Sequence, residues 1–338
     1  MRILVVGPSW VGDMVMAQSL FMSLKKSFPD CLIHVLAPVW SLPLLERMPE
    51  VSKAIVMPLN HGEFCLMTRI KVGRQCRSEG YDQAIVLPNS WKSALIPFFA
   101  NIPQRTGYRG ECRWVLLNDI RRLDKNAITM TVQRFVALGL PENAPQPPYY
   151  QQPSLPNNKT GQEKVIQKFG LTLTDKVLVL CPGAEYGPSK RWPADYFAKV
   201  AQAKIQQGWQ VWLMGSEKDK ESAVAINSLT NQQCRDFIGQ TSLTEAVDLM
   251  SLANTIVAND SGLMHLAAAL DKTVIAIYGS TPPEFAPPLC NKAQTVTLNL
   301  PCSPCRQRIC PLYPVGHPEH TQCLTGITPE RILELIGN

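Results

Sequence analysis

Short apolar runs alternate with helical stretches along the chain, in an order that occurs twice. The order is strand, glycine-containing loop, helix and strand, and it covers residues 2–36 and again 177–213. The strands and helices that the pattern predicts are residues 2–6, about 12–26, 32–36, 177–180, about 193–207 and 210–213. This order is that of a βαβ unit. The chain is therefore predicted to have two similar halves.

The predicted strands are continuously apolar, and this indicates how they are covered. Further runs of this kind are residues 84–87, 255–258 and 273–277. A strand that is apolar on both faces belongs to a parallel sheet with helices on each side. We therefore predict an α/β protein of two Rossmann-like domains. Their functional site is expected in the cleft between them, at the carboxyl ends of the strands.

A proline-rich segment separates the two halves. Six prolines fall between residues 141 and 156, without a convincing period, which is typical of an extended, semi-rigid linker. We predict a first domain over residues 1–157, including the linker at 141–157, and a second over 158–338. The last predicted helix, residues 329–336, belongs to the second domain or packs back on the first.

The composition excludes several classes of protein. Hydrophobic residues make up 45% and charged residues 18% of the 338 residues, which excludes a disordered chain. No apolar run approaches the roughly 20 residues of a membrane span. The apolar start of the chain is only a few residues long, too short for a signal peptide. We expect a soluble, cytosolic protein.

The net charge of +6 lies entirely in the first half. Residues 1–150 hold 17 Lys and Arg against 11 Asp and Glu, whereas residues 151–338 hold 16 of each. Such an excess suggests an anionic partner for the first half, and the alternative is a solvated basic surface. The candidates for contacts to an anionic acceptor are Asn89, Lys92, Arg105, Arg109 and Arg113.

The loop after the first strand, from Gly7 to Asp13, carries neither common nucleotide-binding fingerprint. It lacks G-x-G-x-x-G, and Asp13 and Met14 stand where a P-loop has Lys and Ser or Thr. It does place the Asp13 carboxylate at the start of a helix, which favours the ionised form. Asp13 is a candidate catalytic group, and the alternative is a helix-capping aspartate.

The segment from Asn259 to His265 follows the predicted strand at 255–258. Its turn at Asp260, Ser261 and Gly262 leads into a helix whose first amides are suited to an anion such as a diphosphate. His265 lies one turn further and can face the same ligand. We interpret these residues as a ligand site, with a helix cap and a core histidine as the alternative.

Two further residues in the second half are candidates for the same ligand. Lys190, in a loop of prolines and glycines, supplies a positive charge, and the alternative is a solvated basic loop. Glu217 follows the strand at 210–213 and is suited to accept hydrogen bonds from ribose hydroxyls. It is equally well explained as an acid in the first turn of a helix.

Four of the eleven cysteines form a cluster near the end of the chain. Cys302, Cys305, Cys310 and Cys323 follow the spacing C-x2-C-x4-C-x12-C, which resembles a zinc site only loosely. We favour a loop of reduced thiols and no metal, with zinc as the alternative. The other seven cysteines have apolar neighbours and are expected to be small buried residues.

Three segments resemble bacterial lipopolysaccharide heptosyltransferases. They are Arg2 to Ala17, Asn89-Ser90 with Lys92, and Asn259 to His265. The resemblance runs in order along nearly the whole chain, including the cysteine-rich loop. It implies the GT-B fold, with two Rossmann-like domains, and inverting transfer without a catalytic metal or other cofactor.

The resemblance also implies a role for each matching residue. Asp13 matches the proposed base, Lys190, Ser261 and Gly262 match contacts to the donor diphosphate, Asp260 and His265 match residues near the donor sugar, and Glu217 matches the ribose ligand. The sequence departs from the family pattern in the donor loop. Hydroxyl residues near the phosphate in a related heptosyltransferase correspond here to Glu185 and Tyr186.

The expected function is therefore that of an inverting glycosyltransferase. It would move L-glycero-D-manno-heptose from ADP-heptose to the first heptose of the lipopolysaccharide inner core. The excess charge suits transient contact with the cytosolic face of the inner membrane, since each basic residue near an anionic surface contributes about 1 kcal/mol. Alternatives are a heptosyltransferase with another core acceptor and a nucleotide-sugar epimerase of the same fold. A zinc or nucleic-acid binding protein is disfavoured, because the 7% of aromatic residues do not interleave with basic ones.

Overall fold

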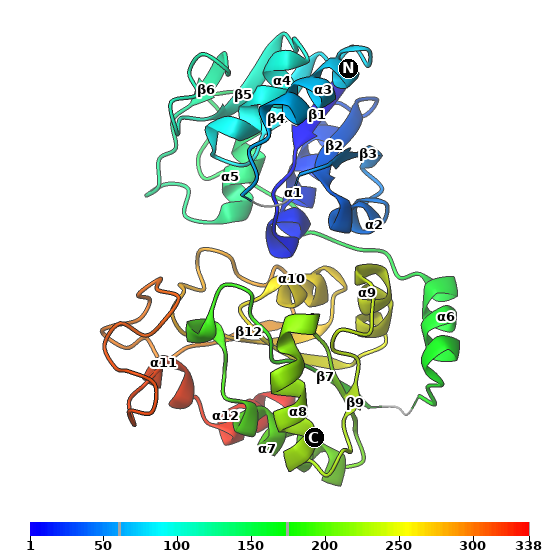
Figure 1. Ribbon diagram of the computed structural model, residues 1–338, viewed down its shortest axis with the longest axis vertical. Coiled ribbons are helices and arrows are strands. Elements are labelled where there is room, and N and C mark those ends of the chain that lie inside the picture. Colours follow the sequence, from blue (N-terminus) through cyan, green and yellow to red (C-terminus); the bar gives the residue numbers. More distant parts are fainter. Residues whose placement is uncertain (60–61, 174–175, 338) are drawn as a thin grey trace. The chain divides into compact units, whose positions relative to one another are not determined.

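The chain divides into two compact units in a computed structural model that describes residues 1–59, 62–173 and 176–337 (Figure 1). The units are Met1–Pro153 and Ser154–Asn338. The predicted boundary, after residue 157, lies a few residues later. The Leu155 amide already donates to the Ala269 carbonyl at 2.8 Å, so the end of the proline-rich segment is anchored in the second unit.

The first unit is built on a parallel sheet of six strands. Its strands are β1 (Arg2–Val6), β2 (Leu32–Pro38), β3 (Val51–Met57), β4 (Gln83–Val86), β5 (Gln104–Tyr108) and β6 (Asp119–Arg121). Their order is β3-β2-β1-β4-β5-β6. In register, Val6 lies opposite Leu36 on one side and Val86 on the other. The carboxyl ends of β1, β2 and β4 therefore meet at one edge.

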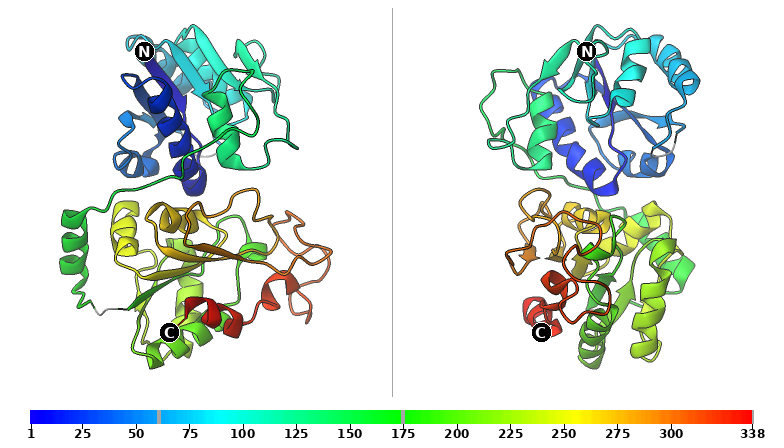
Figure 2. Two further views of the ribbon diagram at one scale, coloured as in Figure 1. Left: turned by 180° about the vertical axis from the view of Figure 1, so that it is seen from behind. Right: turned by 60° about the vertical axis from the view of Figure 1, so that its left-hand side comes forward.

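Helices cover both faces of this first sheet. They are α1 (Val11–Ser27), α2 (Leu42–Leu45), α3 (Leu66–Arg77), α4 (Leu95–Phe99) and α5 (Thr131–Leu138). Helices α1 and α5 pack together on one face, and α3 and α4 on the other (Figure 2). Because both faces are covered, four of the five β1 residues are buried, which explains its continuous apolar run.

The second unit repeats this topology. Its strands are β7 (Val177–Cys181), β8 (Gln210–Leu213), β9 (Arg235–Asp236), β10 (Thr255–Asn259), β11 (Thr273–Ile277) and β12 (Ala293–Val296). They are parallel, in the order β12-β11-β10-β7-β8-β9. Counted from the first strand of each unit, both sheets have the order 3-2-1-4-5-6, which is that of the Rossmann fold. The predicted α/β class is confirmed.

Helices also enclose the second sheet. They are α6 (Lys159–Phe169), α7 (Ala194–Gln206), α8 (Lys220–Leu229), α9 (Leu243–Ser251), α10 (Gly262–Ala269), α11 (Gln322–Thr325) and α12 (Pro329–Ile336). The last helix, α12, packs on α7 and β11, with Ile332 in the same core as Trp192 and Phe197. It therefore belongs to the second unit.

The cysteines depart from their predicted burial at three positions. Cys31, Cys76, Cys181 and Cys234 are buried as predicted, but Cys290 is half-buried, and Cys65 and Cys112 are exposed. Both exposed residues lie in irregular segments after strands of the first sheet, with positive φ angles of 21° and 46°. Across the ranges that the structure describes, no helix has the length and apolar character needed to cross a bilayer.

Candidate active site

The carboxyl end of β10 organises the loops of the second unit through Asn259. This side chain is fully buried. Its Oδ1 accepts from the Trp192 amide at 3.1 Å, and its Nδ2 donates to the Pro182 carbonyl at 2.7 Å. The loop after β7, the start of α7 and the end of β10 are thus held together by one amide side chain, because a buried amide needs such partners.

Lys190 and Asp260 form a close ion pair at this edge. Lys190 Nζ lies 2.5 Å from Asp260 Oδ2, and the two side chains are only 13% and 10% exposed. The Thr281 hydroxyl donates to the same carboxylate oxygen at 2.5 Å. Lys190 is therefore no solvated loop residue. Thr281 was not predicted, although the pair Ser280-Thr281 follows the strand at 273–277 and could have drawn attention to it.

The Ser261 hydroxyl lies at the start of α10 and has no partner in the described part of the chain. Ser261 occupies the N-cap position, yet its side chain makes no capping hydrogen bond. Its Oγ is buried and has no hydrogen-bond partner among the residues that the structure describes. A buried polar atom at a helix start is normally hydrogen-bonded, so this atom and the first amides of α10 are suited to bind an anion. The capping alternative for Ser261 is wrong.

His265 lies one turn into α10 and is 5% exposed. Burial lowers its pKa to about 4, which outweighs the opposite influence of the Asp260 carboxylate. At neutral pH the imidazole is therefore uncharged. It can donate or accept a hydrogen bond but adds no positive charge to the site.

A buried carboxylate that sequence reasoning missed, Asp219, joins the loops after β7 and β8. It accepts from the amide and hydroxyl of Ser216, both at 2.9 Å. A Cβ atom at Gly183 would lie 2.3 Å from this carboxylate, so glycine is required there.

Glu217 begins a turn of 3-10 helix, is 67% exposed and pairs with Lys220 at 2.5 Å. Glu217 thus lies in the first turn of a helix, as its alternative interpretation predicts. Its carboxylate is nevertheless accessible.

In the first unit, Asp13 is the third residue of α1. The N-cap is Trp10, and its side chain makes no capping hydrogen bond. Asp13 therefore does not occupy the N-cap position itself. It lies in the first turn, half-buried, where the helix dipole stabilises a negative charge.

Asn89 lines a cavity of about 280 Å³ at the carboxyl ends of β1, β2 and β4. Its Oδ1 accepts from Arg113 Nη2 at 2.8 Å, and a Cβ on Gly110 would lie 2.6 Å from its Nδ2. Arg113 is 1% exposed and also donates to the Tyr108 and Pro88 carbonyls at 2.6 and 2.7 Å. Arg113 therefore positions Asn89 and does not reach a ligand itself.

The charged groups of Lys92 and Arg69 donate hydrogen bonds to backbone carbonyls of the loop before α3. Lys92 Nζ donates to the Gly62 carbonyl at 2.9 Å. The Arg69 guanidinium donates to the carbonyls of Phe64, Glu63 and Lys92 at 2.6, 2.9 and 3.0 Å. Both cations border the cavity beside Asn89, but their first partners are backbone oxygens.

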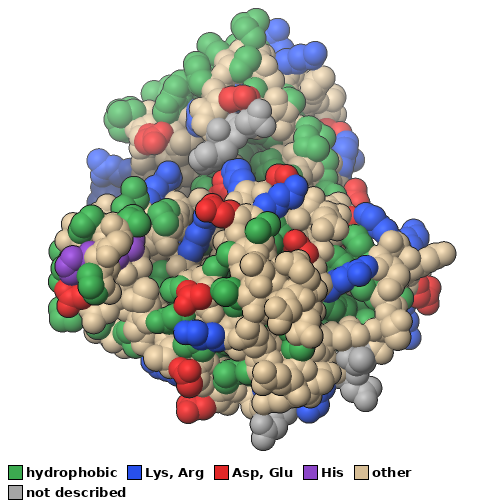
Figure 3. All heavy atoms as spheres, turned by 60° about the horizontal axis from the view of Figure 1, so that its bottom comes forward, with side chains coloured by type: hydrophobic (Ala, Val, Ile, Leu, Met, Phe, Trp, Pro, Cys, Tyr) green, Lys and Arg blue, Asp and Glu red, His purple; other side chains and the backbone are tan. Residues whose placement is uncertain are grey.

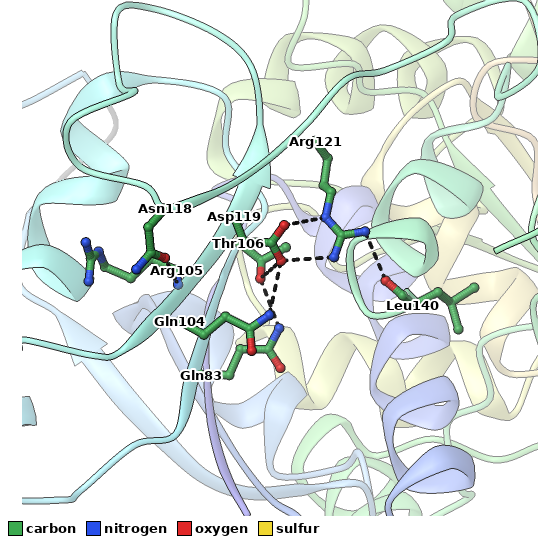
Figure 4. A network of polar contacts seen from close by, with 8 residues as sticks. All are labelled: Gln83, Gln104, Arg105, Thr106, Asn118, Asp119, Arg121 and Leu140. Carbon is green, nitrogen blue, oxygen red and sulfur yellow. Dashed lines mark hydrogen bonds and ion pairs between the residues drawn. The ribbon is translucent and has the colours of Figure 1, made fainter. Parts of the chain in front are cut away.

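Arg105 and Arg109 lie at different ends of β5. Arg105 is near its beginning, where the guanidinium donates to the Leu116 and Ile102 carbonyls at 2.7 and 2.6 Å. Figure 4 shows it beside a separate network in which Arg121 is bound to Asp119. Arg109 follows the carboxyl end and is exposed. Of these two residues, only Arg109 lies at the edge that carries Asn89.

The four clustered cysteines line one small cavity of about 30 Å³ together with Ser189 and Ser280. Within residues 1–59, 62–173 and 176–337, no three His, Cys, Asp or Glu side chains are arranged to hold a metal ion. The same segment exposes Ile309, Leu312 and Val315. Figure 3 shows histidine side chains among hydrophobic ones at one side of the face it presents.

Two doubly wound parallel sheets in succession, with an anion-suited helix start at the edge of the second, match the GT-B class of fold. The family model described as glycosyltransferase family 9 (heptosyltransferase) matches residues 69–315. The chain belongs to this family.

Similarity to individual relatives extends over almost the entire chain. It is 46% identical to lipopolysaccharide heptosyltransferase 2 of Salmonella typhimurium, over 99% of this chain and 97% of the relative. The Haemophilus influenzae lipooligosaccharide heptosyltransferase 2 is 47% identical over 88% and 89%. The solved structure of Escherichia coli ADP-heptose LPS heptosyltransferase II superposes with a TM-score of 0.87 at 43% identity, covering 99% and 97%.

Proposed function

We propose that the protein transfers L-glycero-D-manno-heptose from ADP-heptose to the first heptose of the lipopolysaccharide inner core, with inversion at the anomeric carbon. The observation that carries the proposal is the Ser261 hydroxyl at the start of α10, which has no hydrogen-bond partner among the described residues and follows Asp260 of the Lys190–Asp260 pair in sequence. This cluster is suited to a diphosphate. The named relatives, heptosyltransferases acting on lipopolysaccharide or lipooligosaccharide, supply the class of donor and acceptor.

The second unit is proposed to hold the donor. The amides of α10 and the Ser261 hydroxyl would bind the diphosphate, and Lys190 would offset the charge that develops on ADP as it leaves. Asp260 keeps Lys190 in place at 2.5 Å, and the neutral His265 would hydrogen-bond near the donor sugar. The exposed Glu217 carboxylate would accept from the ribose hydroxyls.

Asp13 is proposed as the general base. In the transfer, the acceptor oxygen forms a bond to the anomeric carbon while the bond from that carbon to the ADP oxygen breaks. The hydroxyl proton passes to the Asp13 carboxylate, and the bonding electrons leave with ADP. A base within hydrogen-bond reach lowers the barrier of such a step by a factor of about 10² to 10⁴.

The acceptor is proposed to bind the first unit near the cavity of about 280 Å³ lined by Asn89 and Lys92. Arg109, exposed at the same edge, would contact its anionic groups. The excess positive charge of residues 1–150 and exposed aromatic residues of this unit, Trp10, Trp40 and Trp91, support transient contact with an anionic membrane surface. Arg105 is left out of this proposal, because it lies at the opposite end of β5.

Mass spectrometry of reactions with ADP-heptose and separately prepared core acceptors tests the proposal. A gain of one heptose on the mono-heptosylated acceptor alone is expected. A gain on the heptose-free acceptor would assign the protein to another step of core assembly. Release of free sugar without any acceptor would favour an epimerase. Metal analysis of protein purified without chelator completes the test, and no stoichiometric zinc is expected at the four cysteines.

A further inference from the structure

The cysteine-rich loop is joined to the loop that carries Lys190. Ser189 contacts it twice, because its amide donates to the Arg308 carbonyl at 3.2 Å and its hydroxyl donates to the Gln307 carbonyl at 2.5 Å. The Tyr186 hydroxyl donates to the Arg306 carbonyl at 2.7 Å. The approach is close, since a Cβ on Gly187 would lie 2.7 Å from the Arg308 oxygen.

The same loop is also joined to the segment that carries Thr281. The Arg306 amide donates to the Ser280 carbonyl at 2.6 Å, and the Ser303 hydroxyl donates to the Gly279 carbonyl at 2.5 Å. Residues 303–308 are thereby fixed against both segments that contact the Asp260 carboxylate. Backbone and hydroxyl hydrogen bonds thus hold the backbone of residues 303–308 at the edge of the candidate donor site.

Cationic side chains gather over two aromatic rings at this place. Lys190 Nζ and Arg308 Cζ lie 4.9 and 5.3 Å from the centre of the Tyr186 ring. Arg306 Cζ lies 5.9 Å from the centre of the Phe285 ring. A cation over an aromatic face is attracted to it and keeps its hydrogen-bond donors available for another ligand.

The two arginines have no carboxylate partners in the described part of the chain, whereas Lys190 has Asp260. Both arginines are exposed. Lys190 is paired with Asp260, whereas Arg306 and Arg308 add two unpaired positive charges, within the described residues, on the segment that is hydrogen-bonded to the loops of Lys190 and Thr281. The arrangement has an excess of positive charge that an anion of more than one negative charge would balance.

We propose that Arg306 and Arg308 are donor-site residues that hold the diphosphate of the donor together with Lys190, and that Tyr186 fixes the position of Arg308. This inference rests on the proposed function and extends it to the cysteine-rich loop. Guanidinium groups bind phosphate oxygens through two parallel hydrogen bonds. The cysteine-rich loop would then contribute residues to the donor site.

Calorimetric titration with ADP and with adenosine tests the inference. The variants are Arg306→Gln, Arg308→Gln and the double variant, and Arg331→Gln on the exposed side of α12 is the matched control. We expect ADP to bind about tenfold more weakly to the double variant, a typical order for lost charge-assisted hydrogen bonds at an exposed site. Adenosine should bind as it does to the parent, and the control should match the parent for both.

Other outcomes overturn the inference in distinguishable ways. Unchanged ADP binding by a folded double variant would overturn it and leave the proposed function intact. An equal loss for ADP and adenosine would show that the arginines only maintain the loop. A parent that does not bind ADP would overturn the inference and the proposed function together. Should Arg308→Gln unfold, Arg308→Met keeps an apolar stem beside the Tyr186 ring and removes the charge, and unchanged ADP binding by this folded variant combined with Arg306→Gln would overturn the inference.

Discussion

The two units have the same strand order but use their polar residues differently. At the edge of the second sheet, polar side chains pair with one another, as in Lys190 with Asp260, and leave the Ser261 hydroxyl unpartnered within the described residues. At the edge of the first sheet, cations donate to backbone carbonyls. Arg69 and Arg113 are 5% and 1% exposed, so they serve the loops and not a ligand.

This difference shows what a count of charges can and cannot reveal. The first unit has the excess of six positive charges over residues 1–150, but Arg69, Arg105 and Arg113 each donate to two or more carbonyls. The second unit, neutral over residues 151–338, has the cationic cluster at its site. Burial and hydrogen bonding, more than net charge, therefore separate ligand-binding cations from structural ones.

The largest effect is expected at Asp13, the one proposed catalytic group in the first unit. Asp13→Asn keeps the size of the side chain but removes the proton acceptor. Transfer should fall at least about a hundredfold, which corresponds to about 3 kcal/mol of barrier. ADP-heptose should bind nearly as before, because its proposed ligands lie in the second unit.

Turnover, donor binding and melting temperature of one preparation of Asp13→Asn check this expectation. Asp30→Asn, which changes an exposed aspartate of the same unit, is the control. Turnover within a few-fold of the parent would exclude Asp13 as the base.

The second expected effect concerns stability and tests the structural role of buried cations. Burial lowers the pKa of Arg113 to about 10, so it stays charged at neutral pH. Arg113→Ala would leave the Pro88 and Tyr108 carbonyls without this donor, and we expect a loss of about 3 kcal/mol in unfolding free energy. Arg109→Ala, at an exposed position, should change stability by less than about 0.5 kcal/mol.

Urea unfolding of both variants measures the contrast. Equal stability of Arg113→Ala and the parent would show that this buried arginine is not structural. A similar loss of stability in Arg109→Ala would contradict the expectation that only the buried arginine is structural.

The sequence predicted the fold closely because its strands are buried on both faces. Three strands have the predicted bounds, at residues 2–6, 210–213 and 273–277. The strand predicted at 32–36 is two residues longer and ends at Pro38. The cluster of Lys190 with Asp260 was expected from separate motifs at strand ends, since parallel strands bring their carboxyl ends to one edge. Such reasoning places residues near an edge but does not show what each side chain contacts.

The remaining features depend on contacts between distant segments. The bond of Thr281 to Asp260 and the role of Asp219 beside Gly183 require the positions of three loops. Arg113 was grouped with Arg109 because the two are close in sequence, yet one is buried and the other is exposed. Local sequence cannot separate them, because burial here is decided by the loop of Asn89, more than twenty residues away.

A third effect is expected at Lys190, the central cation of the second unit. Lys190→Ala removes a charge that faces the proposed leaving group and leaves Asp260 without its partner at 2.5 Å. We expect kcat/KM for the donor to fall about 10- to 100-fold, with kcat reduced as well as donor affinity. Lys218→Ala, which removes an exposed partner of Glu185, is the matched control and should stay within a few-fold of the parent.

Steady-state kinetics with donor and acceptor varied separately distinguish the roles of Lys190. A change in KM for the acceptor alone would contradict its assignment to the donor site. A loss of stability with unchanged kinetics would make the ion pair purely structural.

The smallest effect is expected from the protonation of His265, which lies buried in the second unit. Its pKa is about 4 in the folded protein and about 6.5 in an unfolded chain. Between these values the unfolded state binds the proton and the folded state does not, so stability falls as the pH drops from about 6.5 toward 4. Between pH 7.5 and pH 5 this one group should lower the unfolding free energy by about 2 kcal/mol.

The variant His265→Gln cannot take up the proton. Over the same pH interval its unfolding free energy should therefore fall by about 2 kcal/mol less than that of the parent. Urea unfolding of parent and variant at both pH values measures the difference, with pH 7.5 as the reference for any packing change caused by the substitution. Parallel losses in the two proteins would show that His265 is not held neutral by burial, and the second unit would then gain a further positive charge at its site in acid.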